Sequence, residues 1–306
     1  GKGWTYLMSV KVFLELVEIK AKTASVLPFI LGLFLAAYHS HTVQPMLALL
    51  FFIAMFLFNM AVDMLDNYHD YVHAVDTEDY QQNTNIIGRE NLSPHLVLAM
   101  LITLVVIAAL LGIYLVTQLG LTLLWLGVFC FAVGFLYSSG PFPLSGLPVG
   151  EFFSGFTMGF MITLISVFVN TGADFTWSWT NLGVIFLVAL PDELWISNLL
   201  LANNICDEQE DNDNHRHTIV HFIGKKWALY AFAVKNTIAF LAIIAAAVLR
   251  LTPWTVLLTL LIIPFVVKQT KLLFNKQVKK ETFPAAIRIL LIGSLVQVVT
   301  FAVGLI

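Results

Sequence analysis

The sequence predicts an all-α, polytopic membrane protein, and this fold class rests on the composition and on a series of long apolar runs. Of the 306 residues, 59% are hydrophobic and 11% are charged, whereas a soluble domain carries roughly 25% charged residues. The mean hydropathy is +0.86. Because the runs are continuously apolar rather than alternating, a transmembrane β-barrel is rejected. Nine runs approach the roughly 20 residues that a spanning helix needs: 23–41, 45–66, 95–117, 120–138, 149–170, 181–203, 227–249, 253–268 and 285–305.

The basic residues predict the orientation of these runs in the membrane. Fourteen of the sixteen Lys and Arg residues fall in the N-terminal segment or in the even-numbered connections between runs. Because positively charged residues stay in cytoplasmic loops, we expect a cytoplasmic N-terminus, an outer C-terminus and an odd number of crossings. Residues 4–19, within an N-terminal segment 1–22, mix apolar and charged side chains and are predicted to form an interfacial amphipathic helix.

Two long polar connections, 67–94 and 204–226, are predicted on the cytoplasmic side. Each follows an even-numbered run and begins with a cluster of Asn and Asp residues, and the two connections lie about four helices apart. This layout indicates one domain over residues 1–306, built from two four-helix halves plus one helix. The two connections are the expected active-site loops.

The first acidic cluster lies at the end of the second run. If that helix continues, Asn59, Asp63, Asp66 and Asp70 share one face, since they are spaced i, i+4, i+7 and i+11. Carboxylates near membrane depth usually face a cavity and carry function. Mg²⁺ prefers oxygen ligands and is commonly held by one or two carboxylates plus substrate phosphates. Two alternatives stay open: a solvated helix end, and a transition-metal site that includes histidines of the same stretch.

The second acidic cluster ends the sixth run. Asn203, Asp207 and Asp211 follow i, i+4 and i+8 spacing, and the guanidinium of Arg216 is suited to phosphate oxygens. Two metal ions between the two clusters would clamp one diphosphate. A calcium loop of the EF-hand type is excluded, because the glycine of the sharp turn and the closing glutamate are missing. A merely solvated loop stays an alternative.

Together the two clusters resemble the UbiA superfamily of intramembrane prenyltransferases, over nearly the whole chain. The second cluster is the closer match, and it is similar to the 1,4-dihydroxy-2-naphthoate polyprenyltransferase branch of menaquinone biosynthesis. That branch usually has Arg and Gly where this chain has Cys206 and His215. The matching residues are Asn203, Asn204, Asp207, Asp211, Arg216 and Thr218.

The first cluster matches the branch with a rearrangement. The leading Asn-Asp pair of the branch is reversed here to Asp66-Asn67, and Asp63 stands where the branch has Asn. The carboxylate count is kept, but the position that contacts metal is left open. The residues that do match are Tyr68, Asp70, Tyr71 and Asp76, together with Lys22-Thr23, Tyr137, Gly140-Pro141, Pro143-Leu144 and Gly150-Glu151.

The resemblance implies a nine-helix bundle with a lipid-accessible cavity and Mg²⁺ as cofactor. The substrates would be a polyprenyl diphosphate and an aromatic acceptor, with 1,4-dihydroxy-2-naphthoate losing CO₂ to give a demethylmenaquinone. The implied catalytic metal ligands are Asp66, Asp70, Asp207 and Asp211, with Asp63, Asp76, Asn67 and Asn203 as further ligands. The implied substrate-binding residues are Lys22, Asn59, Tyr68, Arg89, Tyr137, Arg216 and Lys271.

Other functions and partners follow from the same features. Rival acceptors within the class are 4-hydroxybenzoate, homogentisate, haem and chlorophyllide. An ion-coupled transporter is the rival from another class, although both clusters lie at cytoplasmic helix ends rather than at the midplane. The net charge of −3 does not suggest nucleic acid, so the expected surroundings are lipids of the cell membrane, with the active site on the cytoplasmic side. The polar residues inside the runs are expected to pair across helices: Asp192, Glu193, Asn198, Lys235 and Asn236.

Overall fold

The computed structural model describes residues 3–73 and 85–306, apart from the side chains of Lys20 and Thr23. In this part of the chain the elements are helical, with one isolated β-bridge between Thr5 and Leu92. All nine apolar runs are helical. The all-α class is therefore confirmed. The expectation for Asp76 falls outside the described residues.

Eight helical stretches of the described chain are long and apolar enough to cross a membrane. They are α3 (Pro45–Val72), α6 (Pro94–Leu119), α7 (Leu121–Ser138), Gly150–Asp174, α10 (Trp179–Cys206), α12 (Ile219–Val248), Trp254–Asn275 and α14 (Lys279–Leu305). The first run forms a shorter apolar helix, α2 (Thr23–Ser40). The polytopic class is thus confirmed, while a ninth crossing depends on α2 and, like the side of the N-terminus, stays a prediction.

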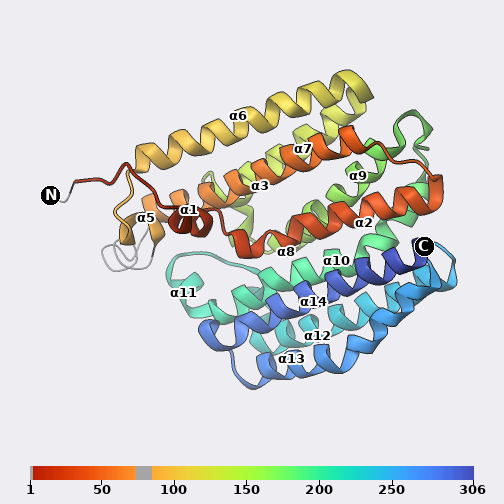
Figure 1. The fold of residues 1–306 in the computed structure, drawn as a ribbon. Helices are drawn as coiled ribbons and strands as arrows, with labels where there is room; N and C mark the ends of the chain where they lie inside the picture. The colour runs from red at the N-terminus through yellow and green to blue at the C-terminus, as the bar shows by residue number, and fades with distance from the viewer. Residues whose placement is uncertain (1–2, 74–84) are drawn as a thin grey trace. The chain divides into compact units, whose positions relative to one another are not determined.

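The helices group into two compact units. Figure 1 colours the ribbon by residue number, so the ranges of each unit can be followed along the chain. Unit 1 comprises residues 1–22 and 50–143, and unit 2 comprises residues 23–49 and 144–306. Helix α2 belongs to unit 2 because it packs on α9 (Ile162–Thr171), where Ser166 donates to the Phe29 carbonyl over 2.8 Å. The two units therefore do not coincide with halves counted along the sequence.

The N-terminal segment of unit 1 is less helical than expected. Helix α1 covers only Val10–Leu16, so the prediction of a helix over 4–19 is wrong in its length. Thr5 is extended instead: its N–H donates to the Asn91 carbonyl (2.7 Å), and its own carbonyl accepts from Ser93 (3.1 Å). Leu16 and Val17 are fully buried in an apolar cluster with residues of α3, α5 (Ile86–Arg89) and α6.

Helix α10 is the central helix of unit 2 and lies beside α12 and α14 (Figure 1). Small residues allow close packing on it. A Cβ at Gly159 would lie 2.6 Å from the Glu193 Cα, and one at Gly293 would lie 2.8 Å from the Trp195 ring. Gly159 belongs to a π-helical turn, Phe156–Met161, between α8 (Gly150–Gly155) and α9.

The polar residues inside the spans pair across helices only in part as expected. Asn198 of α10 donates to Asn236 of α12 over 3.2 Å, which confirms that pair. Lys235 also reaches α10, but its partner is the Ser197 hydroxyl, at 2.6 Å. In the described chain no ion pair joins Lys235 to Asp192 or Glu193.

Candidate active site

The first acidic cluster is carried by the last four turns of α3. The helix continues to Val72, so Asn59, Asp63, Asp66 and Asp70 share one face, as the spacing predicts. Lys22 approaches this face from the N-terminal segment. Its ammonium forms an ion pair with Asp63 and donates to the Asn59 amide oxygen over 2.7 Å. Burial lowers the pKa of Lys22 to about 8, against the raising effect of the nearby Glu18 carboxylate.

Asn67 lies at the edge of this face and has a structural task. Its amide donates to the Leu16 carbonyl (3.0 Å) and to the Asp63 carbonyl (3.2 Å). Its own carbonyl accepts from Asn85 over 3.0 Å, and Asn85 also caps α5. Asn67 therefore ties α1 and the start of α5 to α3, and only its side-chain oxygen is left for a ligand. The reversed pair places the carboxylate of Asp66 on the acidic face and the amide of Asn67 beside it.

The other expected residues of unit 1 lie in packed or paired positions. Tyr68 packs against the apolar cluster around Leu16. Arg89, an expected phosphate contact, is more than a third exposed and pairs with Glu15 and Glu90. Tyr137 is half-buried in the last turn of α7.

The second acidic cluster keeps its helical register across the end of α10. Asp207 joins α10 to the short helix α11 (Glu208–Asp213). The N–H of Asp207 donates to the Asn203 carbonyl (2.9 Å), and the N–H of Asp211 donates to the Asp207 carbonyl (2.7 Å). Asn203, Asp207 and Asp211 therefore share one face, as predicted.

A Schellman turn after α11 brings Arg216 back to this face. His215 has a φ of +59°, its N–H donates to the Asn212 carbonyl (3.2 Å), and the Arg216 N–H donates to the Asp211 carbonyl (2.8 Å). Glycine is the usual residue at such a left-handed position, so the backbone of His215 is strained here. The Arg216 guanidinium then lies 3.7 Å from Asp211 and donates to the Ser145 hydroxyl over 3.1 Å.

Gly146 makes room for the Arg216 side chain. A Cβ at position 146 would lie 3.1 Å from the Arg216 Nε, which is closer than ordinary van der Waals contact. The loop around the short 3₁₀ turn Leu144–Gly146 therefore holds the guanidinium with a hydroxyl at residue 145 and open space at residue 146.

The charges of the second cluster suit a cation. Lys279 of α14 donates to one Asp207 oxygen over 2.8 Å. One oxygen of Asp211, Oδ2, is buried and has no hydrogen-bond partner among the described residues. Burial raises the pKa of Asp211 to about 7, although the Arg216 guanidinium acts in the opposite direction. A buried carboxylate oxygen without a donor is stabilised by a bound cation, and oxygen donors of this kind match Mg²⁺.

With its described residues alone, neither cluster forms a complete metal site. In the part of the chain that the structure describes, no three His, Cys, Asp or Glu side chains converge as cation ligands. Magnesium commonly keeps several waters and takes substrate phosphates as ligands, so this donor set fits an ion that arrives with a diphosphate.

The structure adds contacts that the sequence pattern did not indicate. Lys279 lies 72 residues from Asp207, and Ser145 lies 71 residues from Arg216, so no local spacing links them. Glu151 matches the family pattern, but that pattern indicates no partner for it. Here it accepts from Asn204 over 2.9 Å. Lys271, an expected phosphate contact, is exposed on α13 (Ile263–Asn275).

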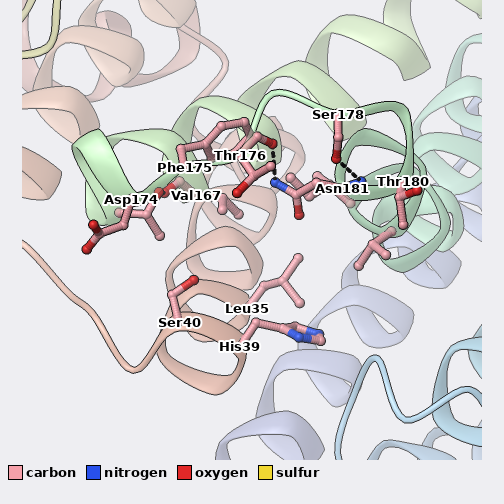
Figure 2. Close-up of a pocket in the computed structure, with 13 residues that line it drawn as sticks. Leu35, His39, Ser40, Val167, Asp174, Phe175, Thr176, Ser178, Thr180 and Asn181 are labelled. Atoms are coloured by element: carbon pink, nitrogen blue, oxygen red, sulfur yellow. Dashed lines mark hydrogen bonds between the residues drawn. The ribbon is translucent and has the colours of Figure 1, made fainter.

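A separate hollow of about 280 Å³ lies in unit 2 (Figure 2). The first turn of α10 lines it, at the opposite end of that helix from the acidic cluster. The hollow lies among the C-terminal ends of α2 and α9 and the N-terminal turns of α10. Its polar lining includes His39, Thr171, Asp174, Ser178 and Asn181. None of the expected site residues that the structure describes lines it.

The fold defines a polytopic helical membrane protein. Two of its helices end in clusters of Asp residues with Asn residues beside them. The chain belongs to the UbiA prenyltransferase family, whose model matches residues 25–293. It is 28% identical to the 1,4-dihydroxy-2-naphthoate octaprenyltransferase of Bacillus subtilis (strain 168) over 245 residues, 80% of this chain and 76% of that protein. The resemblance drawn from the motifs is thereby confirmed, and the chain is a membrane prenyltransferase.

Solved structures support the fold. The apo structure of a UbiA homolog from Aeropyrum pernix K1 has a TM-score of 0.69 and 18% identity, over 96% of this chain and 99% of that one. A UbiA homolog from Archaeoglobus fulgidus, bound to DMAPP and Mg²⁺, has a TM-score of 0.63 and 12% identity, over 95% of this chain and 99% of that one. At these identities the likeness shows the fold alone.

Proposed function

We propose that this protein transfers a polyprenyl group from a polyprenyl diphosphate to 1,4-dihydroxy-2-naphthoate. The products are diphosphate, CO₂ and the quinol (1,4-dihydroxy) form of a demethylmenaquinone. The observation that carries the proposal is the arrangement of Asp211 and Arg216. A buried carboxylate oxygen without a partner suits a cation, and a guanidinium held 3.7 Å away suits phosphate oxygens. The similarity to the naphthoate prenyltransferase of B. subtilis supports the choice of acceptor.

The residues of the two clusters receive distinct roles in this proposal. Asp66, Asp70, Asp207 and Asp211 would hold Mg²⁺, which supplies positive charge to the leaving diphosphate. Asn203 is a further ligand on the same face as Asp207. Asp63 is already paired with Lys22, so it acts mainly by holding that lysine near the acidic face. Asn67 retains only its side-chain oxygen as a possible ligand of the metal ion.

Arg216 is the main phosphate contact. Its guanidinium is oriented by Ser145 and by the Schellman turn, so little rotamer freedom is lost when it binds a phosphate. In the reaction the allylic C–O bond breaks and its electron pair leaves with the diphosphate. The electron-rich ring carbon then forms the new C–C bond, and the carboxylate on that carbon leaves as CO₂ and returns its bonding electrons to the ring.

The test is turnover by the purified full chain in detergent. Labelled geranylgeranyl diphosphate is supplied with 1,4-dihydroxy-2-naphthoate, 4-hydroxybenzoate or homogentisate, with Mg²⁺ or with EDTA. We expect Mg²⁺-dependent product with the naphthoate and release of CO₂. Product with another acceptor alone would replace the proposed substrate. An absence of product with every aromatic acceptor, together with metal-independent solute uptake into liposomes, would support a transporter instead.

A further inference from the structure

Lys235 is a charged side chain inside a spanning helix, and it forms no ion pair with any residue that the structure describes. Its ammonium donates to the Ser197 hydroxyl over 2.6 Å, and in the described chain no carboxylate oxygen lies within 4.0 Å of it. Its neighbour Asn236 has other partners, since it accepts from Asn198 and donates to Thr270. An ionisable residue within the membrane is costly and usually functional. The ammonium of Lys235 is therefore suited to binding an anion.

The depth of Lys235 limits which anion can reach it. It lies 11 residues after Gly224, where the helical backbone of α12 is interrupted, and 13 residues before Val248. These separations correspond to about 16 and about 20 Å of helix. Because the hydrocarbon core is roughly 30 Å thick, the Cα of Lys235 lies in the middle part of this span. Phosphates of lipid headgroups remain at the surface, so the matching anion must be carried on an apolar molecule.

The place of Lys235 relative to the second acidic cluster suits a substrate. Its partner Ser197 precedes Asp207 by ten residues on α10, which is about 15 Å along the helix. Helix α12 begins at the end where α10 stops, and side chains lean toward the N-terminus of their helix. The lysine stem is therefore directed toward the level of Asp207. This separation along α10 is longer than a two-ring aromatic acid.

Glu151 completes the polar surroundings of Lys235. It lies on α8 one turn before Gly155, where a Cβ would lie 3.2 Å from the Ser197 Cβ, and it is outside ion-pair distance of the ammonium. One oxygen accepts from Asn204, while the other, Oε2, is buried and has no hydrogen-bond partner among the described residues. An unpartnered acceptor near an ammonium is suited to a ring that carries both a hydroxyl and a carboxylate. All these residues belong to unit 2.

We propose that Lys235, positioned by Ser197, binds the carboxylate of the aromatic acceptor and so selects a carboxylated ring over an uncharged one. This inference rests on the proposed function, because it assigns the acceptor end of the same reaction. Lys235 is then a specificity-determining residue, and Ser197 is a positioning residue.

The test compares two acceptors in the full chain. 1,4-Dihydroxy-2-naphthoate carries the carboxylate, and 1,4-dihydroxynaphthalene has the same ring without it and loses a proton instead of CO₂. For Lys235→Met we expect the KM for the naphthoate to rise about 10- to 100-fold, as for a lost charge-assisted hydrogen bond. The KM for the prenyl diphosphate and the turnover of the uncharged ring should change less than about 2-fold. Lys235→Arg should restore part of the preference.

A matched control lies on the same helix. Lys226 is exposed and stacks its charge over Trp227, so Lys226→Met removes a lysine of α12 without altering the acceptor preference. Ser197→Ala should raise the naphthoate KM less than Lys235→Met does. Equal losses with both acceptors, or an unchanged preference in Lys235→Met, would overturn the inference even if the proposed function holds.

A binding measurement keeps the inference testable without turnover. Equilibrium dialysis of 1-hydroxy-2-naphthoate against the wild-type protein and Lys235→Met should show a loss of affinity of the same size. Thermal unfolding of each variant reports its fold, and Lys235→Gln serves as the second variant if the Met variant unfolds. Equal affinity in wild type and in the folded variant would refute the assignment. If no aromatic acceptor is prenylated but this difference in affinity persists, only the proposed function fails.

Discussion

Exchanging Asp66 and Asn67 tests how the first acidic cluster works. The double variant Asp66→Asn/Asn67→Asp gives the Asn-Asp order that the resemblance to the naphthoate branch implies. In this structure, however, the Asn67 amide donates to two carbonyls, those of Leu16 and Asp63. A carboxylate at position 67 cannot donate, so it would face two carbonyl oxygens. At the same time the acidic face would lose the carboxylate of Asp66.

The expected losses of folding stability and of turnover follow from these contacts. Two neutral hydrogen bonds contribute about 1 kcal/mol each, and two acceptors left facing a carboxylate add an unfavourable contribution of about the same size. We therefore expect the double variant to lose about 2–4 kcal/mol of stability and to fall at least about 100-fold in kcat. Asn67→Ala should lose about 1–2 kcal/mol but retain most turnover, whereas Asp66→Ala should lose turnover with little change in stability.

Two measurements in detergent separate these effects. Thermal unfolding, followed by tryptophan fluorescence, reports stability, and transfer of labelled geranylgeranyl groups reports turnover. The single variants Asp66→Asn and Asn67→Asp divide the loss between the two positions. A double variant as stable and as active as the wild type would refute the reasoning, because position 67 would then be the ligand position. Equal loss of turnover in Asp66→Ala and Asn67→Ala would contradict it as well.

Three further predictions concern the remaining residues of the two clusters. Asp70→Ala and Asp207→Ala should each abolish turnover, whereas Asp213→Ala on the exposed side of α11 should not, as the same transfer assay would show. Arg216→Lys keeps the charge but not the two-pronged contact, so we expect the KM for the prenyl diphosphate to rise about 10-fold or more; an unchanged KM would remove Arg216 from the phosphate site. His215→Gly removes the strain of a left-handed backbone conformation, which stabilises the folded state by about 1–2 kcal/mol. The glycine also raises the conformational entropy of the unfolded chain, which opposes part of this gain. The net gain should be up to about 1 kcal/mol in thermal unfolding with unchanged turnover, and a loss of stability would contradict the assigned turn.

Much of the fold could be predicted from periodicity and charge alone. The nine apolar runs are helical because the hydrocarbon of a membrane offers no hydrogen-bond partners. A helix satisfies the backbone N–H and C=O groups within the segment itself. The shared faces of Asp63, Asp66 and Asp70 and of Asn203, Asp207 and Asp211 follow from helical spacing, since both helices continue through their clusters. In these regions local geometry is sufficient, so the residues that gather on a face are set by their separation along the chain.

The tertiary structure decided which of these residues are already engaged. Lys22 is held by Asn59 and Asp63, Asn67 is tied to the Leu16 carbonyl, and Lys279 reaches Asp207 from another helix. The expected helix over residues 4–19 is shorter because Thr5 pairs with the backbone around Leu92. Lys235 takes a hydroxyl rather than a carboxylate as its partner. Each of these contacts joins residues far apart in the chain, and the separation of two residues in sequence carries no information about the packing that brings them together.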